Sequence, residues 1–132
     1  MNAHIIILIL ALVGFGESCY LIYERKRKRP PVCVIGNECG EVWASPYSRT
    51  LGIPNEILGV VFYTVIAVVE VLLYRGDTSL VLINGEYAIL IAGTFMSCYF
   101  TYLQWRVICA WCFWCTLSAV ITVVMIATRL LF

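Results

Sequence analysis

Four long apolar stretches limit the fold of this chain more than any other feature. They are His4 to Tyr23, Ile57 to Tyr74, about Glu86 to Leu103, and Val107 to Thr128. Each is close to the roughly 20 apolar residues that cross the hydrocarbon core of a bilayer. Of the 132 residues, 62% are hydrophobic and 13% are charged, which is too apolar for a soluble domain of this size. Because lipid offers no partners to backbone polar groups, each stretch is expected to be a helix.

We therefore expect an all-α integral membrane protein, a four-helix bundle that forms a single domain over residues 1–132. The third and fourth helices should be antiparallel neighbours, since only Gln104 to Arg106 connects them. A signal peptide is the alternative for the first stretch, but Met1 to Ala3 carries no Lys or Arg, and no Ala-x-Ala-like site precedes the basic run. We expect any soluble partner to be a separate chain.

The distribution of basic residues predicts an orientation. Four spans place both termini on one side, and the long loop 24–56 and the last connection on the other, which we call the cysteine side. The cysteine side carries seven Lys/Arg residues and the opposite side carries two, Arg75 and Arg129. The positive-inside rule then places the cysteine side in the cytoplasm. The alternative is an extracytoplasmic or periplasmic cysteine side, with Arg25 to Arg29 only anchoring the first helix at lipid headgroups.

The long loop contains two cysteines that can meet. Gly36-Asn37 is a turn signal between Cys33 and Cys39, so a disulfide between them is feasible and easily exchanged. A static disulfide is one alternative. Another is a metal site with four thiolate ligands, two from this loop and two from the fourth helix. Beyond Cys39 the sequence is apolar with few charges, which predicts a short amphipathic helix or turn that caps one mouth of the bundle.

The run Cys109-Ala-Trp-Cys-Phe-Trp-Cys115 contains two overlapping C-x-x-C pairs. In a helix that starts near Val107, its cysteines form a slanted stripe, and Cys115 lies roughly 12 Å inside at 1.5 Å per residue. Cys112 is nearer the N-terminus, where the helix dipole favours a thiolate. The shallow thiol can meet a protein thiol, whereas the deep thiol can meet only a lipid-soluble acceptor such as a quinone. The alternative is that these cysteines are small packing residues.

Several motifs, taken together and in this order, resemble the vitamin K epoxide reductases and their prokaryotic disulfide-forming homologues. The similarity covers most of the chain: Ser18-x-Tyr-Leu-x-Tyr23, Cys33-Val-Ile-Gly-Asn-Glu-Cys39, Val42 with Ser45 and Tyr47-Ser48, Gly52-Ile-Pro-Asn-x-x-Leu-Gly59, Phe62-Tyr63, and Cys112-Phe-Trp-Cys115-Thr-Leu-Ser118-Ala119. Each motif alone is weak. Their combination on the expected elements is specific.

The resemblance implies roles for the cysteines. Cys112 and Cys115 match the family's active-site pair, with Cys115 facing a quinone. Cys33 and Cys39 match the loop pair that takes electrons from a thioredoxin-like partner, and Cys39 would form a transient disulfide with Cys112. The implied enzyme is a quinone-dependent dithiol/disulfide oxidoreductase that supports protein disulfide formation. Its partners would be that soluble protein, the lipid quinone and the membrane, with no nucleic acid.

The resemblance also implies a quinone site. Asn55 matches an asparagine that hydrogen-bonds a quinone oxygen, although it could simply be a polar residue at the start of a helix. Ser45 matches a Ser/Thr near the quinone, and an apolar cap is expected from Val42, Trp43 and Tyr47, of which Trp43 could instead be an interface anchor. We also expect three further apolar contacts, from Leu58, Phe62 and Phe100.

Two departures from the family pattern bear on the substrate and the orientation. A tyrosine that contacts substrate in the animal enzymes is replaced here by Ala119, which favours an ordinary quinone of the menaquinone or ubiquinone type over vitamin K epoxide. The basic bias resembles the inverted archaeal members, which oxidise cytoplasmic proteins. The alternative functions are vitamin K epoxide or quinone reduction, a non-catalytic metal- or haem-binding membrane protein, and a structural bundle or redox sensor.

Five residues in or near the spans have no assigned role. The intramembrane carboxylates Glu17 and Glu70 should face the interior or a polar mouth, either as helix-packing groups or on a proton route to the quinone. Cys19 and Cys98 are expected to be packing residues. Cys109 is expected to be a reduced bystander near the surface.

Overall fold

A computed structural model describes residues 3–28, 32, 39–46, 49–50, 52–76, 79–109 and 111–132. Within these residues the elements follow one another along the chain as α1 (Ala3–Lys26), α2 (Cys39–Ala44), β1 (Arg49–Thr50), β2 (Ile53–Pro54), α3 (Asn55–Tyr74), α4 (Leu80–Tyr102), a π-helical segment (Leu103–Ile108) and α5 (Phe113–Leu131). The strands β1 and β2 form a short antiparallel ladder just before α3.

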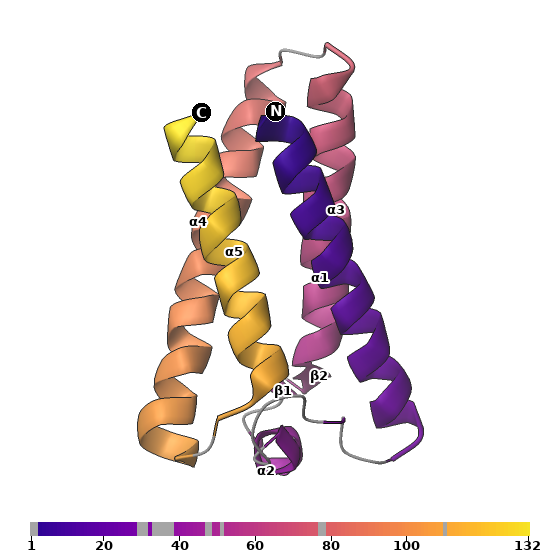
Figure 1. The fold of residues 1–132 in the computed structure, drawn as a ribbon, viewed down its shortest axis with the longest axis vertical. Helices are drawn as coiled ribbons and strands as arrows, with labels where there is room; N and C mark the ends of the chain where they lie inside the picture. The colour runs from indigo at the N-terminus through magenta and orange to yellow at the C-terminus, as the bar shows by residue number, and fades with distance from the viewer. Residues whose placement is uncertain are drawn as a thin grey trace.

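The four long helices form an up-down-up-down bundle, which confirms the expected fold (Figure 1). Around the bundle, α1 packs on α3, α3 on α4, α4 on α5, and α5 on α1. The two termini lie at one end, while α2 and the β1–β2 ladder lie at the other end, across the mouth between α1 and α5 (Figure 1). The predicted short helix that caps one mouth is therefore present as α2.

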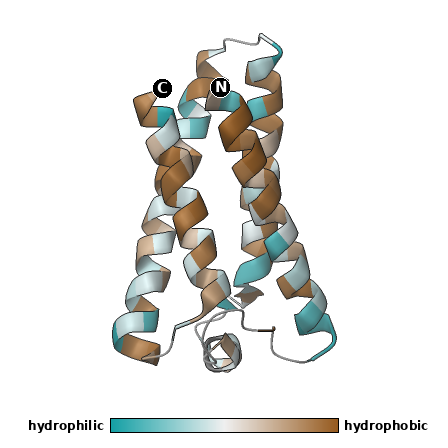
Figure 2. Ribbon diagram, in the orientation of Figure 1, coloured by the Kyte–Doolittle hydropathy of each residue, from teal (hydrophilic) through white to brown (hydrophobic). Residues whose placement is uncertain are grey.

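All four long helices can cross a membrane by length and composition, α4 together with its π-helical extension. Apolar residues cover their middle sections, and the hydrophilic residues of α1 collect at its lower end, beside the α2 end of the bundle (Figure 2). Many large apolar side chains point outward along the helices, among them Val61, Val68 and Phe95. An outer surface of this kind suits lipid, and the chain is an integral membrane protein.

Close contact between α1 and α3 depends on two glycines. A Cβ atom at Gly14 would overlap the ring of Tyr63, and a Cβ atom at Gly59 would lie 2.6 Å from the hydroxyl oxygen of Ser18. The absence of side chains at both positions lets the two helices approach. Tyr63 is consequently fully buried in the central core, together with Ile7, Ala11, Ile66, Leu90, Ile121 and Met125.

A buried ion-pair cluster joins the four helices at the end that holds the termini. Arg129 of α5 contacts Glu70 of α3 at 2.7 Å and Glu86 of α4 at 2.9 Å. His4 of α1 contacts the other oxygen of Glu70 at 2.7 Å. Glu70 faces the interior, as expected for an intramembrane carboxylate, and this pairing accounts for it as a packing group.

The last turn of the bundle differs from the expected one. Residues Gln104 to Arg106 do not connect two helices but belong to the π-helical extension of α4. The chain reverses at Cys109, which has a left-handed backbone (φ 59°), and it is extended at Cys112, so that α5 begins at Phe113 instead of Val107. The expected helical stripe of three cysteines is therefore wrong. Cys109 and Cys112 precede the helix, and Cys115 lies in its first turn rather than roughly 12 Å inside.

Candidate active site

The long loop and α5 meet at two cysteines. Cys39 is the first residue of α2 and is 0% exposed, and Cys112, just before α5, is 4% exposed. The two pack together in one apolar cluster, with Cys115 beside them. The backbone N–H of Phe113 donates a hydrogen bond to Cys39 Sγ at 3.3 Å. The start of α5 thus holds the sulfur of Cys39 next to Cys112.

The cysteines differ in redox state. Cys39 is disulfide-bonded. The others in the described part of the chain are free thiols: Cys19, Cys98, Cys109, Cys112 and Cys115. Cys33 lies outside the described residues. The preceding residue, Val32, is described: its carbonyl accepts a hydrogen bond of 2.7 Å from the indole N–H of Trp114, so Val32 lies beside the first turn of α5.

Cys112 is prepared to act as a thiolate. A hydrogen bond from the Cys115 side chain is the largest influence and lowers the pKa of the Cys112 thiol from 9.0 to about 7. The backbone N–H groups of Trp114 and Cys115 also lower this pKa, whereas burial opposes them. These donors belong to the first turn of α5, where unpaired N–H groups favour negative charge.

Gln104 fixes the backbone of Cys112 and was not predicted from the sequence. The N–H of Cys112 donates a 2.8 Å hydrogen bond to Oε1 of Gln104, which is buried. The side-chain amide of Gln104 donates in turn to the carbonyl of Phe100, at 3.4 Å. Short π-helical segments recur at functional sites, and this one brings a polar side chain of α4 to the cysteine pair.

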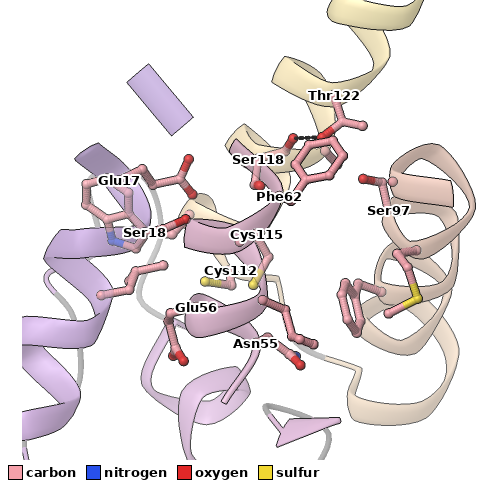
Figure 3. Close-up of a pocket in the computed structure, with 18 of the residues that line it drawn as sticks. Glu17, Ser18, Asn55, Glu56, Phe62, Ser97, Cys112, Cys115, Ser118 and Thr122 are labelled. Atoms are coloured by element: carbon pink, nitrogen blue, oxygen red, sulfur yellow. Dashed lines mark hydrogen bonds between the residues drawn. The ribbon is translucent and has the colours of Figure 1, made fainter. Parts of the chain in front are cut away.

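Cys112 and Cys115 line a cavity of about 480 Å³ between the four long helices. Its wall is mainly apolar, with a small number of polar groups, which is the usual character of a small-molecule site. In the view of Figure 3, the two cysteines lie together, with Asn55 and Glu56 on one side of them and Glu17 and Ser118 on the other. A flat, lipid-soluble ring would fit between these groups.

The structure brings together most of the predicted quinone contacts. Trp43, Asn55, Leu58, Phe62 and Phe100 all line the cavity. Ser45 is described and is not part of the wall. The side chain of Val42 and the whole of Tyr47 lie outside the described residues, so their predicted contacts remain predictions. Ala119, which stands where the animal enzymes have a tyrosine, also lines the cavity.

The wall is completed by polar residues that were not predicted as quinone contacts. Tyr63 of α3 shares a 2.6 Å hydrogen bond with the hydroxyl of Ser118 of α5. Arg25 closes the mouth, because it pairs with Glu56 at 2.7 Å and stacks over the Trp43 ring at 5.3 Å. The other polar members are Glu17, Ser18, Ser97, Gln104 and Thr122. Of these residues, Glu17 had a sequence signal as a carboxylate inside an apolar span, and Ser18, Tyr63 and Ser118 belong to the family-like motifs.

Three other cysteines of the described residues do not line this cavity. Cys19, Cys98 and Cys109 are exposed, and none of them belongs to the wall. Within the described ranges, no three His, Cys, Asp or Glu side chains gather in an arrangement that could hold a metal ion.

Comparison with known proteins identifies the family of this chain. The model of the vitamin K epoxide reductase family matches residues 5–130, which is nearly the whole chain. No curated protein matches the sequence. A match of this extent includes all four long helices, Cys39, and the Cys112–Cys115 pair. The chain belongs to the vitamin K epoxide reductase family.

Proposed function

We propose that this protein is a thiol:quinone oxidoreductase that reoxidises a thioredoxin-like partner and thereby supports protein disulfide formation. Family membership makes it a membrane oxidoreductase of the disulfide- and quinone-linked type in general. One observation carries the finer assignment: the buried Cys39 packs on Cys112, whose pair Cys115 lines an apolar cavity. The Cys112–Cys115 pair can therefore exchange with the loop cysteine on one side and pass electrons to a lipid-soluble acceptor in the cavity on the other.

Electrons enter at the loop pair in this proposal. The two thiols of the partner reduce the Cys33–Cys39 disulfide and leave as a disulfide. The thiolate of Cys39 then attacks a Cys112–Cys115 disulfide at Cys112 and releases Cys115, and Cys33 resolves the mixed disulfide by attacking Cys39. Two electrons have then moved to Cys112 and Cys115. The observed state, with Cys39 in a disulfide and the other two free, corresponds to this stage.

The second half of the cycle passes two electrons from Cys112 and Cys115 to a quinone in the cavity. The cysteines re-form their disulfide, and the quinone takes up two electrons and two protons to become the quinol. In this proposal Asn55, which lines the cavity, polarises a quinone carbonyl, and apolar contacts come from Trp43, Leu58, Phe62 and Phe100. Further contacts are proposed from Ser45, Val42 and Tyr47. Ala119 favours a quinone of the menaquinone or ubiquinone type over vitamin K epoxide, because the wall offers no tyrosine hydroxyl there.

The excess of basic residues on the cysteine side supports a cytoplasmic orientation of this site. Labelling Cys109 with a membrane-impermeant thiol reagent in sealed vesicles tests it, since Cys109 is exposed at the same end of the bundle. Labelling in inside-out vesicles alone is expected. Labelling in right-side-out vesicles alone would place the site outside the cell.

Quinone reduction by the purified protein tests the function itself. With a dithiol donor and a soluble quinone, the native protein should turn over, and the Cys115→Ala variant should lose nearly all turnover. Cys19→Ser, a change at an exposed cysteine away from the cavity, is the matched control and should retain it. Full activity of Cys115→Ala, or stoichiometric bound metal or haem in a protein that reduces no quinone, would contradict the assignment.

A further inference from the structure

Glu17 stands apart from the other buried carboxyl groups of the bundle. It lies in the middle of α1, is 7% exposed, and lines the cavity (Figure 3). Its Oε2 is fully buried and has no hydrogen-bond partner within the described residues. This polar atom therefore faces an apolar wall on which no other side chain satisfies it.

Every other buried carboxyl in the described part of the chain is engaged. Arg129 pairs with both Glu70 and Glu86, and Arg25 pairs with Glu56. Glu24 also has a partner. These groups serve helix packing and closure of the mouth, whereas Oε2 of Glu17 has no partner among the described residues. A carboxylate buried without a partner is costly, so Glu17 is most stable in its neutral form, with a proton to donate.

The groups around Glu17 include thiols that can exchange a proton with its carboxyl group. Glu17 lies close enough to Cys112 and Cys115 for their charges to interact with its own, and it interacts in the same way with Tyr63. The hydroxyl of Tyr63 already shares a 2.6 Å hydrogen bond with the hydroxyl of Ser118. The remaining charged groups at the cavity, Glu56 and Arg25, pair with each other. Glu17 is thus the one carboxyl of the described wall that is left to exchange a proton.

We propose that Glu17 is a catalytic residue that carries a proton from the Cys112–Cys115 dithiol to the quinone bound in the cavity. This inference rests on the proposed function. Glu17 gives its carboxyl proton to one quinone oxygen while two electrons leave the two sulfurs and the S–S bond forms. One thiol proton returns to Glu17, and the other goes to the second oxygen. Both thiol protons end on the quinol, and Glu17 is unchanged.

Single-turnover reduction of a quinone by the pre-reduced protein in lipid nanodiscs tests this role. Glu17→Gln keeps the shape but cannot donate a carboxyl proton, and it should react about 10²-fold more slowly, the usual contribution of a general acid. The affinity for quinone should not change. Glu17→Asp keeps the proton and should recover part of the rate. Glu86→Gln removes a buried carboxyl at the far end of the bundle and should retain the native rate.

A second measurement is independent of turnover. The infrared spectrum of the reduced protein at neutral pH should contain the carbonyl stretching band of a protonated carboxyl, which disappears in Glu17→Gln and shifts in Glu17→Asp. If Glu17→Gln does not fold, both tests are made on Glu17→Asp: a partly reduced rate and a shifted carboxyl band are then expected. An ionised Glu17 in the native protein would overturn the inference.

The outcomes separate this inference from the proposed function. A native protein that reduces no quinone contradicts the proposed function. A native protein that does so, with Glu17→Gln reacting at the native rate, contradicts only the role of Glu17. An equal loss in Glu17→Gln and Glu86→Gln would assign Glu17 to folding instead of proton transfer.

Discussion

The backbone N–H of Cys112 donates a 2.8 Å hydrogen bond to the side-chain oxygen of Gln104. The two residues lie on opposite sides of the turn between α4 and α5, so this bond fixes where α5 begins. It also leaves the N–H groups of the first turn of α5 free to face sulfur: Phe113 donates to Cys39, and Trp114 and Cys115 donate to Cys112. One amide side chain of the π-helical extension therefore holds the start of α5, whose N–H groups contact both reactive sulfurs.

Gln104→Leu should impair this site. The change leaves the N–H of Cys112 buried without a partner, which costs about 1–3 kcal/mol of folding free energy. We expect a lower unfolding temperature in detergent and slower disulfide exchange between the loop and Cys112. Gln104→Glu keeps an oxygen acceptor and is the matched control. Equal, native-like behaviour of both variants would show that the hydrogen bond does not position the cysteine.

The reactivity of Cys112 should depend on pH near neutrality. Its thiol has a pKa of about 7, below the usual 9.0, chiefly because the Cys115 side chain donates a hydrogen bond to it. The alkylation rate of Cys112 in the reduced protein, followed by mass spectrometry, should therefore rise with pH to a midpoint near 7. Since the folded-state pKa is the lower one, the thiolate adds to the free energy of unfolding as pH rises from about 7 to 9, and this contribution is lost as pH falls through 7.

The donor at Cys115 can be removed selectively to check the cause of this pKa. Cys115→Ala should move the alkylation midpoint of Cys112 upward, whereas Cys115→Ser retains a hydroxyl donor and should move it less. An unchanged midpoint in Cys115→Ala would assign the low pKa to the backbone N–H groups alone.

The bundle could be predicted from the sequence because membrane helices leave a strong and simple signal. Four apolar stretches of sufficient length predict four helices, and short connections predict antiparallel neighbours. The start of α5 could not be predicted in this way. No Gly or Pro occurs between Leu103 and Phe113, and a left-handed Cys109 is an unusual reversal for a residue with a side chain. No sequence signal therefore marks the reversal at Cys109, and the sequence predicts the connection at Gln104 to Arg106 instead.

The candidate site was partly predictable for a related reason. Short motifs identify the cysteines, the family resemblance implies Asn55, and the sequence also predicts contacts from Leu58, Phe62 and Phe100. Tertiary contacts decide the rest. The sequence predicts Gln104 as a connecting residue, and the different environments of Glu17 and Glu70 depend on which helices their side chains face. Sequence spacing within one helix contains no information on that packing.

Gly14→Ala should weaken the contact between α1 and α3. A Cβ atom at this position overlaps the ring of Tyr63, so the ring or the helix must shift, and overpacking of a core typically costs about 1–3 kcal/mol. Gly16→Ala is a closely matched control on the same helix, because nothing lies within 4 Å of a Cβ atom there. Thermal unfolding in detergent should show a clear loss for the first variant and little change for the second. A loss of the same size in both would mean that the cost comes from α1 itself.

Arg129→Met should destabilise the bundle at the end opposite to the cysteines. The change removes the cation that pairs with Glu70 and Glu86, and uncompensated buried charge typically costs about 3–5 kcal/mol. Arg75→Met changes an exposed arginine that follows α3 and should have little effect. Combining Arg129→Met with Glu70→Gln and Glu86→Gln should restore much of the stability, because no unpaired carboxylate then remains. Unfolding temperatures of the three proteins distinguish these effects. The ion-pair cluster around Arg129 shares no residue with the wall of the cavity. The single-turnover rate of quinone reduction per folded molecule should therefore stay native in all three variant proteins. A changed rate at native stability would show that the two ends of the bundle are coupled.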